Sequence, residues 1–340
     1  MEIIKKGALI TTMIASVLLT QSCNTNSAGE TKNDSSVIAA KEGDQVKKNQ
    51  QVDTADYNKR MLVISNGDTS GKWPTKPIYP LRGAIFPYNR VVAFYGNLYS
   101  KRMGILGELP KKEMLAKLKG EVANWQKADT SIPVIPALHY VAVTAQSNGG
   151  KQRMRMPAKQ IDTIISWAKE VNALVFLDVQ VGWSTLQEEI PELEKYLKIP
   201  NVHLGIDPEF SMKFGDIPGK RIGTFNSDDV NYTINYLAEI VKKNNLPPKI
   251  LVVHRFTQGM VTNAMNINPT PEVQVLMDMD GWGDKILKKS TWLRYIKKEP
   301  VQFAGFKLFY KNDTKKNKNG LYTPQELLQF TPKPIYIQYQ

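Results

Sequence analysis

The sequence contains one cysteine and only three histidines, and both scarcities limit the chemistry that the chain can support. A single cysteine, Cys23, leaves no partner for an intramolecular disulfide. Neither a His-x-His nor an HExxH spacing occurs, which argues against amidohydrolase-type and zincin-type metal sites. The chain also lacks the GxSxG elbow of a serine nucleophile and a GxGxxG dinucleotide loop. We therefore expect neither a metal ion nor an organic cofactor.

The chain also lacks an apolar run long enough to span a bilayer as a helix. Residues 7–19 are apolar, follow Lys5 and Lys6, and have the length of a signal-peptide core. The next residues, LTQSC, resemble a loose lipoprotein signal of the Bacteroidetes type. The resemblance implies cleavage before Cys23, diacylation of Cys23, and a lipid anchor in the cell envelope. The alternative is an ordinary signal peptide with a chance cysteine.

Composition divides the chain into three segments. Residues 1–22 form the expected signal peptide. Residues 23–60 are polar and are expected to form a lipid-anchored flexible tether, and residues 61–340 form one folded domain. The net charge of +13 favours anionic surroundings such as lipid head groups or anionic glycans. Because the basic residues are scattered, we do not expect nucleic acid as a partner. The sequence does not indicate an oligomeric state.

Apolar strand-like segments alternate with amphipathic helix-like segments throughout the folded domain. The expected strands are 91–96, 132–143, 173–180, 202–207, 250–256, 273–280, 301–309 and 334–339. The expected helices are 111–127, 158–171, 186–197, 228–244, 284–298 and 324–329, with a short irregular piece at 263–266. Eight strands alternating with helices predict an α/β fold, the (β/α)8 TIM barrel. A doubly wound open sheet is the alternative.

Polar residues follow a period of two at the ends of three strands. Asp178 is paired in this way with Gln180, Asp207 with Glu209, and Asp278 with Asp280. Residues two apart on a strand lie on the same face, so each pair is expected to point into the mouth of the barrel. Buried carboxylates are costly unless they are paired or used, which favours a functional site at the C-terminal ends of the strands.

Paired carboxylates with aromatic side chains nearby are the groups that glycosidic cleavage needs. One acid protonates the leaving oxygen, a second group stabilises or attacks the anomeric centre, and aromatic rings stack on sugar faces. The candidate catalytic residues are Glu209, Asp207 and Asp178. The candidate substrate-binding residues are Tyr95, His139, Gln180, His254, Asp280, Trp282 and Gln338. The expected partner is a glycan or a cell-wall polysaccharide.

Two segments resemble a known family of enzymes. Residues 202–209, VHLGIDPE, resemble the fourth-strand motif of family 18 glycoside hydrolases, and residues 275–280, VLMDMD, are similar to the sixth strand of that family. The resemblance implies that Glu209 is the general acid, that Asp207 orients an attacking acetamido group of the substrate, and that Asp280 binds substrate. The sequence departs from the family where aspartates are expected, at Val202 and Leu204, and where Met279 replaces a tyrosine.

The whole domain resembles a family of uncharacterised bacterial lipoproteins with a glycosidase-like barrel. The resemblance rests on the segments FYG, LGE, DVQ, DPE and a terminal YQ. It implies the fold and the position of the site and does not extend to an activity.

Two other functions remain open. A barrel of this kind could bind a glycan without turnover, and acids neutralised by Arg255 or Lys307 in a filled mouth would favour that function. A metal-dependent hydrolase would require His139 and His254 to meet beside Asp178 or Asp207. The third histidine, His203, lies at a strand start and is therefore expected at the opposite end of the barrel.

Overall fold

The computed structural model describes residues 51–68, 70, 72–73, 78–315 and 319–340. The expected signal peptide, the lipidation site Cys23 and the tether up to residue 50 lie outside the described residues, so these assignments stay predictions. None of the described helices is both long enough and apolar enough to cross a membrane.

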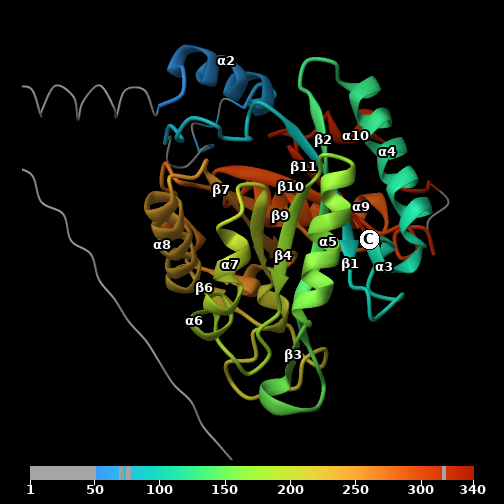
Figure 1. Ribbon diagram of the computed structural model, residues 1–340. Helices are drawn as coiled ribbons and strands as arrows, with labels where there is room; N and C mark the ends of the chain where they lie inside the picture. The colour runs from blue at the N-terminus through green and yellow to red at the C-terminus, as the bar shows by residue number, and fades with distance from the viewer. Residues whose placement is uncertain (1–50, 69, 71, 74–77, 316–318) are drawn as a thin grey trace, which may run out of the picture. The chain divides into compact units, whose positions relative to one another are not determined.

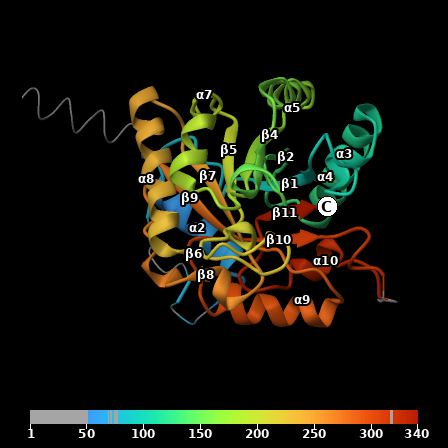
Figure 2. The ribbon, with the colours of Figure 1, turned by 90° about the horizontal axis from the view of Figure 1, so that it is seen from below.

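Eight parallel strands form a closed barrel, which confirms the predicted (β/α)8 fold and rules out the open doubly wound sheet. Each strand pairs with the next barrel strand along the chain, and the last pairs with the first. Figure 2 looks into the ring of strands from the end at which they finish. The strands are β1 (Arg90–Gly96), β2 (Val134–Ala145), β4 (Leu174–Val179), β5 (Val202–Ile206), β7 (Lys249–Arg255), β9 (Val273–Met279), β10 (Phe303–Leu308) and β11 (Tyr336–Tyr339).

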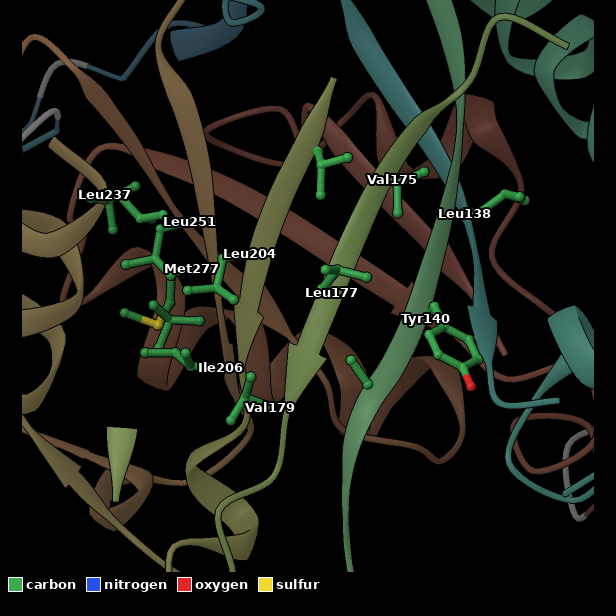
Figure 3. Close-up of a cluster of buried hydrophobic side chains, with 14 of the residues drawn as sticks. Leu138, Tyr140, Val175, Leu177, Val179, Leu204, Ile206, Leu237, Leu251 and Met277 are labelled. Carbon is green, nitrogen blue, oxygen red and sulfur yellow. The ribbon is translucent and has the colours of Figure 1, made fainter. Parts of the chain in front are cut away.

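Helices surround the strands in Figures 1 and 2 and bury the apolar side chains on the outer face of the barrel. Figure 3 shows part of this layer, in which strand residues such as Leu177 and Leu204 and the helix residue Leu237 belong to one cluster. The longer described helices are α4 (Lys111–Ala128), α5 (Ala158–Glu170), α8 (Ser227–Asn244) and α9 (Lys285–Thr291), and the short ones are α3 (Ile105–Glu108), α6 (Leu186–Glu189), α7 (Glu194–Leu197) and α10 (Pro324–Leu327).

Two expected helices are interrupted. The segment 186–197 divides into α6, a 3-10 turn over Pro191–Leu193, and α7, because a proline lacks the N–H that a continuous helix would need at that position. The segment 284–298 begins as α9 and continues as a π-helix over Trp292–Lys297. The remaining expected helices agree with the structure apart from a few terminal residues.

Short strands lie outside the barrel order. β3 (Arg153–Arg155) pairs antiparallel with the end of β2. The two-residue strand β6 (Phe225–Asn226) pairs parallel with β8 (Val261–Thr262).

The helix α2 (Thr54–Ser65) closes the end of the barrel where the strands begin. Its buried residues Tyr57, Met61 and Ile64 belong to the same apolar cluster as the side chains inside this end of the barrel. We call this part the lower interior; it lies at the top of Figure 1. Asp53 caps the helix by accepting hydrogen bonds from two backbone amides of its first turn. The folded domain thus begins before residue 61 and includes part of the segment that composition assigned to the tether. The few apolar side chains of that segment are placed on one face of a helix, which composition alone does not reveal.

Candidate functional site

The inward-facing side chains change from apolar near the start of a strand to polar near its end. On β4, Phe176 joins the apolar lower interior, whereas Asp178 lies one inward position higher and is fully buried among polar groups. Glycines at inward positions make room for these groups. A Cβ at Gly205 would lie 2.5 Å from Asp178 Oδ1, and a Cβ at Gly305 would lie 2.5 Å from Asp278 Oδ1. The upper interior is therefore a polar cluster with space reserved for carboxylates.

One arm of the cluster runs from β1 across β4 to β5. The Tyr95 hydroxyl donates to Asp178 Oδ2 at 3.0 Å. The Gln180 amide donates to Asp207 Oδ2 at 3.2 Å and to the Tyr95 hydroxyl at 3.4 Å. The backbone amide of Ala145 in turn donates to Gln180 Oε1 at 3.1 Å, which fixes the orientation of the side chain. Four of the predicted site residues are thus connected.

The second arm centres on His254 and Lys307. His254 Nδ1 lies 3.1 Å from Asp280 Oδ2 and 3.4 Å from Asp278 Oδ2, and His254 Nε2 lies 3.5 Å from Asp178 Oδ1. The ammonium of Lys307 pairs with Asp280 Oδ1 at 2.9 Å and lies 3.9 Å from the centroid of the Tyr95 ring. This arm joins the fifth, sixth and seventh barrel strands to the first arm.

His139 lies in the lower part of the cluster. Its ring stacks on Phe176 at a centroid distance of 5.4 Å, and Nδ1 lies 2.6 Å from the Tyr336 hydroxyl and 3.0 Å from Gln338 Nε2. His139, His254 and Gln338 are all fully buried. A sugar at the mouth would therefore meet other residues first, and the expected substrate-binding role of these three stays a prediction. They support the groups above them.

Glu209 lies at the rim of the cluster. The strand β5 ends at Ile206, and the chain turns through a 3-10 turn over Pro208–Phe210. Asp207 Oδ1 accepts from the Glu209 backbone amide at 3.1 Å, which places the half-buried Glu209 side chain above the fully buried ones. Of the candidate catalytic carboxyls, Glu209 is the one that a ligand reaches most readily.

The pKa values of the carboxyl groups are shifted in two opposite directions. Burial, together with the charge of Asp280, raises the pKa of Glu209 to about 7. Burial also raises the pKa of Asp207 well above its usual value, with the nearby charges of Glu209 and Asp178 acting in the same direction. Burial alone would raise the pKa of Asp280 too, but Lys307 and His254 outweigh it and lower that pKa.

The pKa of Asp178 is also lowered, because His254 and His139 outweigh the effect of burial. The ionised carboxylates are thus Asp178 and Asp280. Asp207 is buried, and no ammonium or guanidinium forms an ion pair with it among the described residues, which agrees with the direction in which its pKa is shifted.

The other expected residues lie apart from the cluster. Trp282 is 63 % exposed on the loop after β9. The guanidinium of Arg255 points away from the mouth and pairs with Glu299 at 2.6 Å. His203 lies at the lower end of the interior, as expected, where Nδ1 accepts from the backbone amide of Ile250 at 3.1 Å. Of the two cations considered beforehand, only Lys307 neutralises an acid of the site.

Three residues of the cluster have no role predicted from the sequence, namely Tyr336, Gly205 and Gly305. Tyr336 precedes the expected site residue Gln338 by two positions, so the period of two could have placed it on the inner face. The glycines give no such signal, because their role depends on which side chains their neighbours direct toward them.

The arrangement supports acid catalysis at the rim and offers donor atoms for a cation below it. His139, Asp178 and His254 each present one donor atom, and these atoms lie within 4.8 Å of one another. The chain matches no protein-family model and no curated protein sequence.

Proposed function

We propose that the protein is a glycoside hydrolase-like enzyme of the cell envelope, with Glu209 as the proton donor and a glycan or cell-wall polysaccharide as substrate. The local resemblance of residues 202–209 to family 18 glycoside hydrolases supports this proposal, as does the position of the site at the C-terminal ends of barrel strands.

One observation carries the proposal: a half-buried, protonated carboxyl lies at the mouth beside an ionised one. Among the described residues, Lys307 forms its ion pair with Asp280 and not with Glu209. Glu209 therefore keeps a pKa of about 7, so roughly half of the molecules hold its proton at pH 7 and can donate it as a general acid. Asp280 stays ionised and can stabilise the positive charge that develops at the anomeric carbon.

The remaining groups of the cluster position these two carboxyls or support them from below. Asp207 accepts a hydrogen bond from the Glu209 backbone amide and fixes the turn that carries the acid. Gln180 holds Asp207, and Tyr95 lies under Lys307 and bonds to Asp178. In this scheme Asp178 supports the site from below and does not contact the substrate, because its side chain is fully buried.

A second candidate function is glycan binding without turnover. The 2.9 Å contact between Lys307 and Asp280 favours it, because a neutralised carboxylate stabilises an oxocarbenium-like centre less well than a free one. The exposed Trp282 would serve either function by stacking on a sugar face.

The substitution Glu209→Gln tests the proposal, because it preserves shape and removes the acidic proton. We expect turnover of peptidoglycan fragments or polysaccharides, measured by new reducing ends, to fall by a factor of about 10² to 10⁴, while glycan binding persists. Glu239→Gln on the exposed face of α8 is the matched control and should leave turnover unchanged. Turnover that survives in Glu209→Gln would refute the acid role. Binding by a wild-type protein that releases no reducing ends would favour the second function.

The proposed location rests on the N-terminal sequence. If Cys23 carries the lipid, Cys23→Ala should move the protein from the detergent phase to the aqueous phase in phase partition. A variant that stays in the detergent phase would contradict the lipid anchor.

A further inference from the structure

Three buried donor atoms converge in the lower part of the polar cluster. His139 Nε2 and His254 Nε2 each lie 3.5 Å from Asp178 Oδ1. All three side chains are completely buried, and within the described part of the chain none of the three atoms makes a hydrogen bond. Buried polar atoms without partners are costly, so their convergence from three different strands needs a reason.

The spacing suits a metal ion. With metal–ligand bonds of about 2.1 Å, two ligands of a tetrahedral zinc ion lie about 3.4 Å apart, close to both measured distances. Two imidazoles and one carboxylate form a donor set that suits late first-row dications such as zinc.

The far side of each imidazole is held by other groups. His254 Nδ1 lies 3.1 Å from Asp280 Oδ2, and His139 Nδ1 lies 2.6 Å from the Tyr336 hydroxyl. A carboxylate or hydroxyl oxygen that accepts from Nδ1–H orients the ring and leaves the Nε2 lone pair for a metal, as is usual for histidine ligands. At His139 this tautomer requires the Gln338 amide, whose nitrogen lies 3.0 Å from Nδ1, to turn its oxygen toward the ring. The second oxygen of Asp178 is likewise held, by the Tyr95 hydroxyl at 3.0 Å.

A glycine allows two of the donor atoms to approach the backbone of β5 closely. A Cβ at Gly205 would lie 2.5 Å from Asp178 Oδ1 and 2.7 Å from His139 Nε2, so any side chain there would press on two of the three donor atoms.

We propose that His139 Nε2, Asp178 Oδ1 and His254 Nε2 form a binding site for a divalent transition metal, with zinc as the best-suited ion. The site goes beyond the proposed glycosidase function and does not depend on it. It replaces the sequence-based expectation that the protein binds no metal. That expectation rested on short sequence spacings, whereas these ligands come from β2, β4 and β7, which are distant in sequence.

The test is zinc binding by the purified chain after treatment with EDTA. We expect calorimetry to show one equivalent of Zn²⁺, zinc to raise the melting temperature, and Co²⁺ to give the visible absorption of a low-coordinate site. No substrate is needed, so failure of the glycosidase proposal would leave this result unaffected.

The variants His139→Asn and His254→Asn keep an atom near the position of Nδ1 and remove Nε2. Each should weaken zinc binding at least a hundredfold, by loss of a direct ligand, and should abolish the rise in melting temperature. The matched control is His203→Asn, which keeps an acceptor for the Ile250 amide and should bind zinc as the wild type does. Gly205→Ala retains all three ligands but places a methyl group against two of them, and should also weaken binding.

Three outcomes would overturn the proposal. The first is a wild-type protein that binds no zinc, in which case His254 is an imidazolium held between Asp178 and Asp280. The second is zinc binding that survives His139→Asn and His254→Asn unchanged. The third is an anomalous-scattering peak for zinc in a crystal at any position other than among these three side chains.

Discussion

The two ends of the barrel interior carry opposite kinds of side chain. The lower end, which we call the floor, contains Phe86, Phe176 and Phe303 and is closed by α2. The upper end, the mouth, contains the polar cluster around Asp178 and His254. The division runs through single strands, since Phe176 and Asp178 are neighbouring inward positions of β4. One strand therefore supplies stability at its start and chemistry at its end.

The mouth, unlike the floor, contains unfavourable electrostatic interactions that the fold tolerates. The floor gains free energy from burying apolar surface. The mouth buries carboxyls whose repulsion raises the pKa of Asp207 and Glu209, which costs free energy at neutral pH. Such a cost is typical of a site selected for function, and it predicts that substitutions at the two ends change stability in opposite directions.

The largest effect on stability is expected at the floor. Phe176→Ala should lower the free energy of unfolding by about 3–5 kcal/mol, because it removes a fully buried aromatic ring and leaves a cavity. It also removes the ring that stacks on His139 at 5.4 Å, so the site above should loosen. Urea denaturation measures the loss. A change below about 1 kcal/mol would mean that the floor does not carry the stability of the barrel.

A smaller effect of opposite sign is expected at the mouth. The pKa of Glu209 rises from 4.5 in a free chain to about 7 in the folded protein, so the folded state binds its proton more tightly. The resulting penalty is absent below about pH 4, grows as pH rises, and is complete above pH 7. Glu209→Gln should therefore match the wild type at pH 4 and exceed its stability by up to about 3 kcal/mol at pH 8.

Denaturation of EDTA-treated protein across this pH range measures the difference, with Glu239→Gln as the control for a surface carboxyl. A variant that is less stable than the wild type at pH 8 would show that Glu209 is structural. The same titration predicts that any glycosidase activity declines as pH rises through 7, because the ionised acid no longer donates a proton.

The barrel could be predicted because its evidence is local and repeated. Each strand is an apolar segment separated from the next by a helical period, and eight such units leave few alternatives to closure. The interruption at Pro191 was not predicted, although a proline inside an expected helix is a signal for it. The start of the domain was not predicted either, because α2 is stabilised by contacts of Tyr57 and Met61 with the floor, far away in sequence.

The site could be predicted only in part. The period of two placed Asp178, Asp207 and Asp280 on the inner face correctly, since alternation is a local property of a strand. Protonation states could not be derived in this way, because they depend on whether Lys307 lies nearer to Asp280 or to Glu209. The convergence of His139 with His254 depends on barrel closure and on the space left by Gly205.

The smallest effect on stability is expected at the rim of the mouth. Trp282 is 63 % exposed, so Trp282→Ala should change the free energy of unfolding by no more than about 0.5 kcal/mol. If this ring stacks on a bound sugar, its loss removes about 0.5–1.5 kcal/mol of binding free energy, which weakens glycan affinity by a factor of about 2 to 10. Trp282→Phe retains an aromatic face and should recover most of the affinity.

Leu62→Ala on α2, 72 % exposed near the floor, is the control and should bind glycan as the wild type does. Isothermal titration with the same glycan separates the outcomes. Equal affinities for Trp282→Ala and Leu62→Ala would show that Trp282 does not contribute to glycan binding. A loss confined to Trp282→Ala would place ligand recognition at the mouth.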